Sequence, residues 1–411
     1  MVNCECLCMK KWVLPNGMTV LYEHRDTPSV TVQVLVNVGS DGETDSQRGI
    51  AHFMEHMVFE GTKKRENAKI ITNEIERVGG VSNAYTTNAR TCYHAKVPAK
   101  HFDIALDVTA DMLREPLLRE SDTQRQKHIL FKEIDLVTDE PRFHQWIIFQ
   151  KTMFLKHPSK NPTYGTREAV QKVKAADLRA FFEQYYYPGN MMIAIVGNVP
   201  DVYARVARAF GGGKRKLPVH WKHVVEPPQK KNRMKKEKRK SVASTYVALG
   251  HRTVARMHPD SVVLDVIDGI LGRGQSGWMF DEIRNKAGLA YEVGTEKASE
   301  KDYGFYATYL SIDRKNMKKS IALVLEQLKK LEKVSEHDVV EAKMSVEGSL
   351  LLDMEDTQRM ADELLYWEHI KDARELDKYI YHINNVTVAD VRRVARTYFS
   401  KPHVLAVIEG K

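Results

Sequence analysis

A chain of 411 residues is too long for one compact core, so its length alone predicts two domains. Its composition, 43% hydrophobic and 28% charged residues, is that of a folded globular protein and argues against a disordered chain. No apolar run reaches the length of a transmembrane helix, and the first twelve residues contain no apolar signal-peptide core. We therefore expect a cytoplasmic protein with no membrane anchor.

Cysteine usage and charge add little to this prediction. Four cysteines are too few for a disulfide framework, and Cys4, Cys6 and Cys8 lie too close together for unstrained bridges. They have no matching second pair of ligands, which disfavours a structural metal site there. The net charge of +9 comes mostly from residues 230–240, KKNRMKKEKRK. Because no aromatic residue interrupts this run, we interpret it as a solvated linker rather than a nucleic-acid contact.

The hydrophobic periodicity predicts alternating groups of strands and helices along the first half. In chain order, strands are expected at 18–24 and 29–38, helices at 47–60 and 66–78, strands at 81–86 and 91–97, a mainly helical stretch at 101–155, and a strand at 191–199. This order is typical of an α+β fold rather than of a regular βαβ winding. We expect a mainly antiparallel sheet covered on one face by helices.

The second half repeats the first. EIERVGG at 74–80 matches EIRNKAG at 282–288, and the stretches that begin at Ile104 and Tyr185 resemble those that begin at Ile321 and Tyr398. The matches fall in the same order. The repeat predicts two tandem homologous domains, with an N-terminal domain at 1–213, a charged linker at 214–240 and a C-terminal domain at 241–411.

The segment GIAHFMEHMVFEGT carries the strongest chemical signal. His52 and His56 are four residues apart, so on a helix they share a face and can bind one metal ion. Glu55 lies between them and can stand beside an open coordination position, which is the HxxEH arrangement of inverzincins. Catalytic zinc usually has three protein ligands and a water, and the candidate third ligand is Glu133, 77 residues beyond His56.

Nearly the whole chain resembles the pitrilysin family of metallopeptidases. The similar blocks, in the family's order, are LPNGMTVLYEH, VNVGSDGE, GIAHFMEHMVFEGT, EIERVGGVSNAYTTNARTCYHAKV, YYYPGNMMIAIVG and FDEIRNKAGLAYEV. The resemblance implies a zinc-dependent endopeptidase with one Zn²⁺ per chain, held by His52, His56 and Glu133, and with Glu55 activating the attacking water. The neighbouring acids Asp135 and Asp139 are interpreted as charges on a helix surface.

The resemblance also implies how a substrate is held. An unfolded peptide would lie extended beside a strand near Asn83, Ala84 and Thr86, adding a strand by backbone hydrogen bonds. Arg284 and Tyr291 match the family's RxxxGLAY pair, which contacts the substrate or the tetrahedral intermediate, and both can donate to a developing oxyanion.

The second domain is expected to be inactive. Its positions that correspond to His52, Glu55 and His56 are Asp260, Val263 and Leu264, which cannot hold zinc. By resemblance we expect this domain to face the first across the linker as a clamshell, and the chain to form a homodimer.

Two departures from the family pattern bear on activity. Gln126 stands where a second glutamate is common, and Ala89 replaces a usual acid; an outer carboxylate affects ligand orientation and proton transfer. Alternative functions are a non-catalytic binding clamp and a subunit of a heterodimeric processing peptidase. His94, His144 and His157 have no ligand spacing and are interpreted as surface or packing residues.

Overall fold

The computed structural model describes residues 9–410, so Cys4, Cys6 and Cys8 lie outside the described residues. The chain forms two compact units, each made of three segments. The first contains the described residues up to Asp135, then Asn161–Lys222 and Leu352–Asp377; the second contains Leu136–Lys160, His223–Leu351 and the described residues from Lys378 onward. No helix among residues 9–410 is long and apolar enough to cross a membrane.

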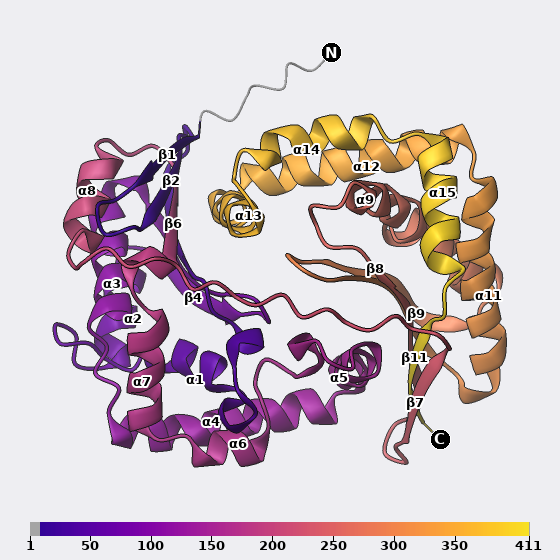
Figure 1. The fold of residues 1–411 in the computed structure, drawn as a ribbon, viewed down its shortest axis with the longest axis horizontal. Helices are drawn as coiled ribbons and strands as arrows, with labels where there is room; N and C mark the ends of the chain where they lie inside the picture. Colours follow the sequence, from indigo (N-terminus) through magenta and orange to yellow (C-terminus); the bar gives the residue numbers. More distant parts are fainter. Residues whose placement is uncertain (1–8, 411) are drawn as a thin grey trace. The chain divides into compact units, whose positions relative to one another are not determined.

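The first unit is built on a six-stranded sheet (Figure 1). In sheet order its strands are β1 (Lys10–Val13), β2 (Thr19–Glu23), β6 (Met191–Val196), β3 (Ser29–Val36), β5 (Thr91–Pro98) and β4 (Val81–Thr86). All neighbours are antiparallel except β2 and β6. Strand β4 lies at the edge and pairs with β5 alone.

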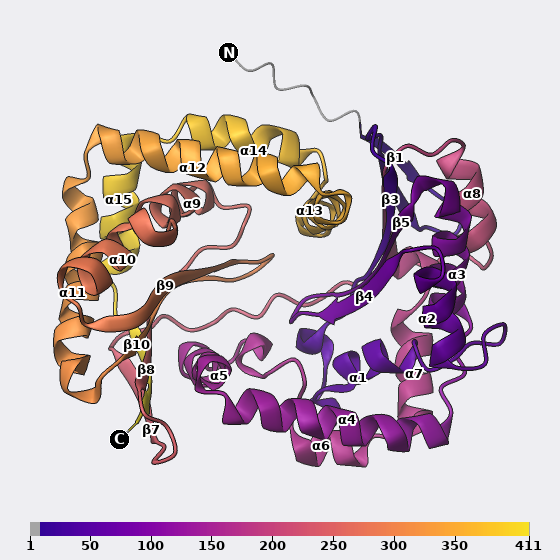
Figure 2. The same cartoon turned by 180° about the vertical axis from the view of Figure 1, so that it is seen from behind.

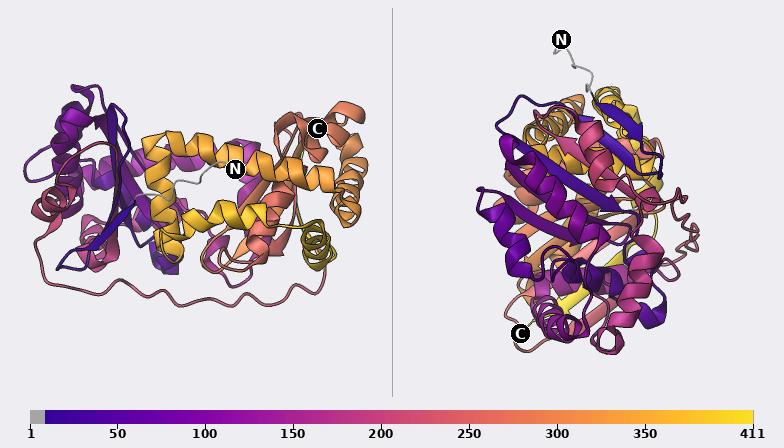
Figure 3. Two further views of the ribbon diagram at one scale, coloured as in Figure 1. Left: turned by 90° about the horizontal axis from the view of Figure 1, so that it is seen from above. Right: turned by 90° about the vertical axis from the view of Figure 1, so that its left-hand side faces the viewer.

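Helices cover one face of this sheet (Figure 3, right). The helices of this side are α1 (Ile50–Met57), α2 (Ala68–Glu76), α3 (Phe102–Arg114), α4 (Glu120–Asp139), α6 (Arg167–Lys172), α7 (Ala175–Tyr185) and α8 (Val202–Phe210). Of these, α1, α2, α3 and α8 pack on the strands. Alternate residues of β3, Val30, Val32 and Val34, are fully buried in the same hydrophobic core as Phe102 of α3. This two-residue alternation directs one side of the strand toward the helices.

The other face of the first sheet carries a helix from the far end of the chain. Helix α13 (Thr357–Ile370) packs on β3 and β6, opposite α3 (Figures 1 and 2). The contact is partly polar, because Thr31 and Thr357 share a hydrogen bond of 2.9 Å and Gln33 donates to Asp362 at 2.6 Å. The sequence does not predict this helix on the first sheet, since the pairing joins residues more than 300 positions apart.

The second unit repeats the arrangement of the first. Its sheet order is β7 (Arg233–Lys238), β11 (Val404–Glu409), β8 (Thr245–Thr253), β10 (Gly304–Ile312) and β9 (Ala290–Ser299). Taken in chain order, these five strands occupy the places of β2 to β6, including the one parallel pair. The predicted α+β class with two homologous sheets is therefore confirmed.

The helices of the second unit include one from the first half of the chain. They are α5 (Pro141–Met153), α9 (Asp260–Leu271), α10 (Trp278–Phe280), a π-helical turn (Asp281–Lys286), α11 (Met317–Lys330), α12 (Glu336–Glu355), α14 (Glu375–Asn384) and α15 (Val388–Phe399). Helix α5 packs on β11 and β8, and the boundary between the units falls within α4, α12 and α14. Each sheet therefore receives one helix from the other half of the sequence.

The predicted linker is only partly unstructured. Residues 211–232 contain no helix or strand and run as extended chain (Figure 3, left), whereas Arg233–Lys238 form β7. The repeat of the second unit thus begins inside the segment assigned to the linker. The basic run is an edge strand whose lysines are mostly exposed, a composition that keeps sheet edges from pairing with other chains.

Candidate metal centre

Helix α1, which carries the HxxEH residues, is capped from a distance. Its N-cap, Gly49, has φ of 91°, a conformation suited to glycine, and supplies no side chain. The buried Glu43 carboxylate accepts hydrogen bonds from the backbone N–H groups of Gly49 at 2.8 Å and Ala51 at 2.9 Å. Glu43 therefore satisfies two donors that the start of the helix leaves without partners.

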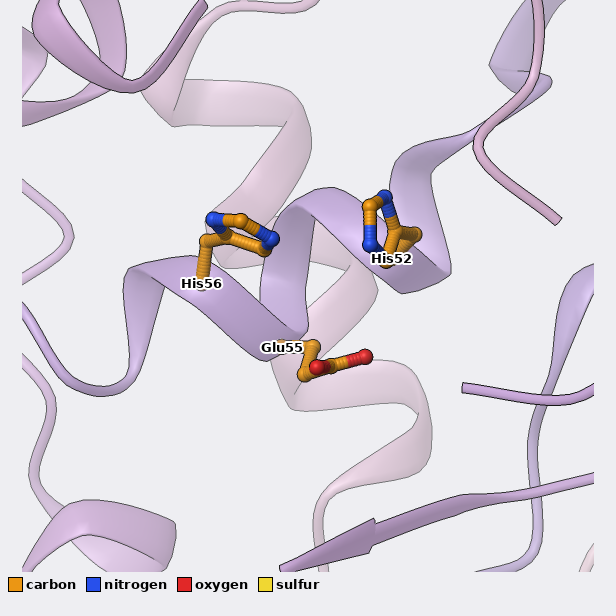
Figure 4. A group of neighbouring side chains, drawn as sticks. All are labelled: His52, Glu55 and His56. Atoms are coloured by element: carbon orange, nitrogen blue, oxygen red, sulfur yellow. The ribbon is translucent and has the colours of Figure 1, made fainter. Parts of the chain in front are cut away.

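His52 and His56 project from the same side of α1 (Figure 4). Their ring centroids are 4.8 Å apart, and potential donor atoms of His52, Glu55 and His56 all lie within 4.8 Å of one another. Among residues 9–410 this is the one such group of three or more His, Cys, Asp or Glu side chains. The i, i+4 spacing on the helix thus produces the predicted convergence.

Helix α4 brings Glu133 to the two histidines. Its Oε2 atom lies 3.8 Å from His52 Nε2 and 3.5 Å from His56 Nε2. Both separations are long for a hydrogen bond. Two donors bound at about 2.1 Å to one tetrahedral zinc ion lie about 3.4 Å apart, so the distance of Glu133 from each histidine suits ligands of a shared ion. The donor set of two imidazoles and one carboxylate is also that of catalytic zinc sites.

Burial favours the neutral, metal-binding form of His52. Burial, together with the smaller effect of the neighbouring His56, lowers the pKa of His52 to about 3. Its Nδ1 atom is buried and has no hydrogen-bond partner in the described part of the chain. An uncharged imidazole has a lone pair available for a metal ion.

Glu55 is held by the edge strand. Burial raises the pKa of the Glu55 carboxyl, and a hydrogen bond donated by Thr86 Oγ1 at 2.5 Å opposes this shift. A carboxyl whose pKa is raised in this way is a better proton acceptor at neutral pH than an ordinary glutamate. The sequence predicts Thr86 as a substrate contact; the structure places its hydroxyl on Glu55.

A pocket of about 610 Å³ lies over the three candidate ligands and Glu55. Gly80–Ala84, which include the start of edge strand β4, form one wall, so Asn83 and Ala84 line the pocket; their contact with a substrate stays a prediction. The other lining residues are Phe59, Glu60, Thr72, Glu76 and Gln126. The pocket therefore lies between the candidate metal ligands and the edge strand β4, and no lysine or arginine lines it.

Arg284 and Tyr291 lie together in the second unit. The Arg284 guanidinium is 5.6 Å from the Tyr291 ring centroid and 4.8 Å from that of Phe280. Arg284 lies in the π-helical turn, and the Tyr291 side chain is 75% exposed on β9. The structure thus pairs the two residues, and their contact with a substrate stays a prediction.

The structure also shows the surroundings of residues interpreted from the sequence as surface, packing or non-ligand residues. Asp135 forms an exposed ion pair with Arg167 at 2.7 Å, as expected of a helix-surface charge. His144 and His157 pair with Glu237 and Asp302 at 3.0 and 3.2 Å. Val263 and Leu264 are buried in the core of the second unit, where they cannot act as ligands.

Comparison with known proteins identifies the chain. Residues 19–167 match the model described as Insulinase (Peptidase family M16), and residues 172–346 match the Peptidase M16 inactive domain. An uncharacterized zinc protease of Mycobacterium tuberculosis is 31% identical over 98% of this chain and 93% of its own length. The chain belongs to the M16, or pitrilysin, family. An uncharacterized zinc protease of Bacillus subtilis is 29% identical over 97% of this chain and 98% of its own.

Solved structures of M16 proteins have the same fold. A protease from Helicobacter pylori superposes with a TM-score of 0.93 at 25% identity, covering 98% of this chain and all of its own. A structure titled as a peptidase M16 inactive domain, from Pseudomonas fluorescens, gives a TM-score of 0.89 at 18% identity and 98% coverage of both chains. The same description, Peptidase M16 inactive domain, applies to residues 172–346 of this chain.

Proposed function

We propose that this M16 protein is a zinc-dependent endopeptidase that binds one zinc ion per chain and cleaves unfolded peptides held in extended form. The observation that carries the proposal is the convergence of His52, His56 and Glu133 in one pocket, with Glu55 beside them. The names of its relatives, which are called zinc proteases, support zinc as the metal. When bound, zinc would supply Lewis-acid chemistry that activates water and polarises a carbonyl.

Glu55 would act as the general base. Its carboxylate would take a proton from the attacking water and pass it to the leaving amine, which needs a group that gains and loses a proton near neutral pH. Burial supplies this property, and the Thr86 hydroxyl fixes the orientation of the carboxylate. Glu55 would therefore contribute to the rate rather than to metal affinity.

The edge of β4 would align the substrate. An extended peptide could pair with the unoccupied edge of this strand and place a scissile carbonyl over the pocket, since Asn83 and Ala84 border both. A folded protein cannot offer an extended segment of this kind. The proposed substrates are accordingly unstructured peptides, and Arg284 and Tyr291 would contact them from the second unit.

The test compares the wild type with Glu55→Gln on quenched, unstructured peptides, with zinc content measured on both. We expect equal zinc content and a loss of kcat of at least about a hundredfold in the variant. Asp135→Asn, a matched change of an exposed carboxylate on α4, should leave both quantities unchanged. Near-normal cleavage by Glu55→Gln would refute the assigned role, and zinc binding without cleavage by the wild type would favour the binding clamp or the heterodimeric subunit.

A further inference from the structure

A series of buried, hydrogen-bonded side chains supports His56 on the side of its Nδ1 atom. The His56 Nδ1 atom is 3.2 Å from the Oε1 atom of Gln126, and the Gln126 amide nitrogen donates a hydrogen bond to Glu60. Gln126 and Glu60 are 6% and 8% exposed, so both side chains are largely shielded from water. The Arg125 guanidinium pairs with Glu60 from the same helix as Gln126.

The donor and acceptor groups of these three side chains, His56, Gln126 and Glu60, fix the direction of each hydrogen bond. Glu60, paired with an arginine, is a carboxylate that only accepts, so the amide N–H₂ group of Gln126 must face it. The amide oxygen of Gln126 must then face His56, and an oxygen acceptor requires a proton on Nδ1. A neutral imidazole with its proton on Nδ1 has its lone pair on Nε2, the atom that lies 3.5 Å from Glu133.

We propose that Gln126, oriented by Glu60, is a positioning residue that fixes His56 as the Nδ1–H tautomer and so presents Nε2 to the metal. The inference rests on the proposed zinc site but not on peptide cleavage. His52 lacks this support, because its Nδ1 atom has no partner in the described part of the chain. Partners that orient a metal-binding histidine usually change metal affinity by 10- to 100-fold.

The amide of Gln126 can accept a hydrogen bond from His56, so position 126 can support the histidine without a carboxylate. A glutamate at position 126 beside Glu60 would place two like charges in a buried setting, and one of them would have to take up a proton. Gln126 instead accepts from the histidine and donates to the acid. If the two residues were exchanged, with the amide at position 60 and the carboxylate at position 126, the carboxylate would accept from both His56 and the amide. The hydrogen bonds would then be satisfied as before.

The experiment measures zinc affinity by chelator competition and the His56 tautomer by NMR of zinc-free protein with ¹⁵N-labelled histidine rings. We expect Gln126→Leu and Glu60→Gln each to weaken zinc binding by about 10- to 100-fold and to remove the Nδ1–H signature of His56. The double change Glu60→Gln with Gln126→Glu should recover most of the loss. Gln124→Ala, a control at an exposed glutamine on the same helix, should have no effect.

Two outcomes would overturn the proposal. One is a zinc-free wild type in which His56 carries its proton on Nε2, and the other is a folded Gln126→Leu variant whose zinc affinity lies within threefold of the wild type. Circular dichroism of each variant distinguishes loss of the fold from loss of the hydrogen bond. Both readouts are independent of peptide cleavage. The proposal for Gln126 can therefore fail while the peptidase function holds, and the peptidase function can fail while the proposal for Gln126 holds.

Discussion

Removal of the Glu43 carboxylate should loosen the helix that carries the metal centre. In Glu43→Ala, two buried N–H groups, of Gly49 and Ala51, lose their acceptor. An unsatisfied buried donor costs about 1–3 kcal/mol. Water entering the vacated space would satisfy part of this demand, so we expect a total of about 2 kcal/mol, which is an increase of about 30-fold in local opening.

The assay is hydrogen–deuterium exchange of the peptide that spans Ile50–Met57, read by mass spectrometry. Exchange in Glu43→Ala should be about 30-fold faster than in the wild type, and zinc should bind more weakly. Asp45→Ala is the control, because it removes an exposed acid of the same loop that pairs with Arg48. Unchanged exchange in Glu43→Ala would refute the reasoning that this carboxylate stabilises the start of α1.

The same residue gives a dependence on pH whose sign can be worked out. Burial raises the pKa of Glu43 from 4.5 to about 8, against the effect of the two N–H donors. The folded state therefore binds the proton more tightly than the unfolded chain, and the contribution of Glu43 to stability falls as pH rises from about 4.5 to about 8. Glu43→Gln cannot titrate, so its stability relative to the wild type should improve over this window. A flat difference would contradict the shift.

Three further predictions concern activity and assembly. Thr86→Val removes the hydrogen-bond donor that lowers the pKa of Glu55, so that pKa should rise. The acid limb of the profile of kcat/KM against pH should therefore move to higher pH, with activity at pH 7 reduced about tenfold. An acid limb at the wild-type pH would contradict this prediction. Glu76 lines a pocket that has no lysine or arginine, so Glu76→Gln should lower kcat/KM about threefold for peptides with a basic residue near the cleaved bond, and not for neutral ones. Light scattering of the purified chain should give the mass of a homodimer, and a monomer mass would refute that expectation.

The local features of the site could be predicted from the sequence because they depend on near neighbours. The four-residue spacing of His52 and His56 needs only a helix, and the strand that contains Asn83 and Ala84 has the expected bounds. The supporting interactions could not be predicted in this way. Glu43 caps α1 across a loop, and Gln126 meets Glu60 across 66 positions, so no periodicity reveals either contact.

The strand β7 and helix α13 were missed for a different reason. A basic run such as residues 233–238 lacks the apolar alternation of a half-buried strand, because an edge strand with exposed faces does not need it. Helix α13 buries an apolar stripe that includes Met360, Leu364 and Leu365, and it adds polar contacts of Asp362 and Thr357 with Gln33 and Thr31. Its place on the first sheet depends on contacts between residues that lie far apart in the sequence, which its own periodicity does not reveal.

The exchange of α5 and α13 between the two halves bears on what the second repeat contributes to the first unit. The first sheet carries the strand that borders the metal pocket, and one of its faces is covered only when residues 352–377 of the second half are present. Polar side chains on that face, such as Gln33, have their partners on α13, and a buried polar group without a partner is costly. A chain that kept its metal ligands but lost the second repeat would therefore lose part of the structure that supports β4.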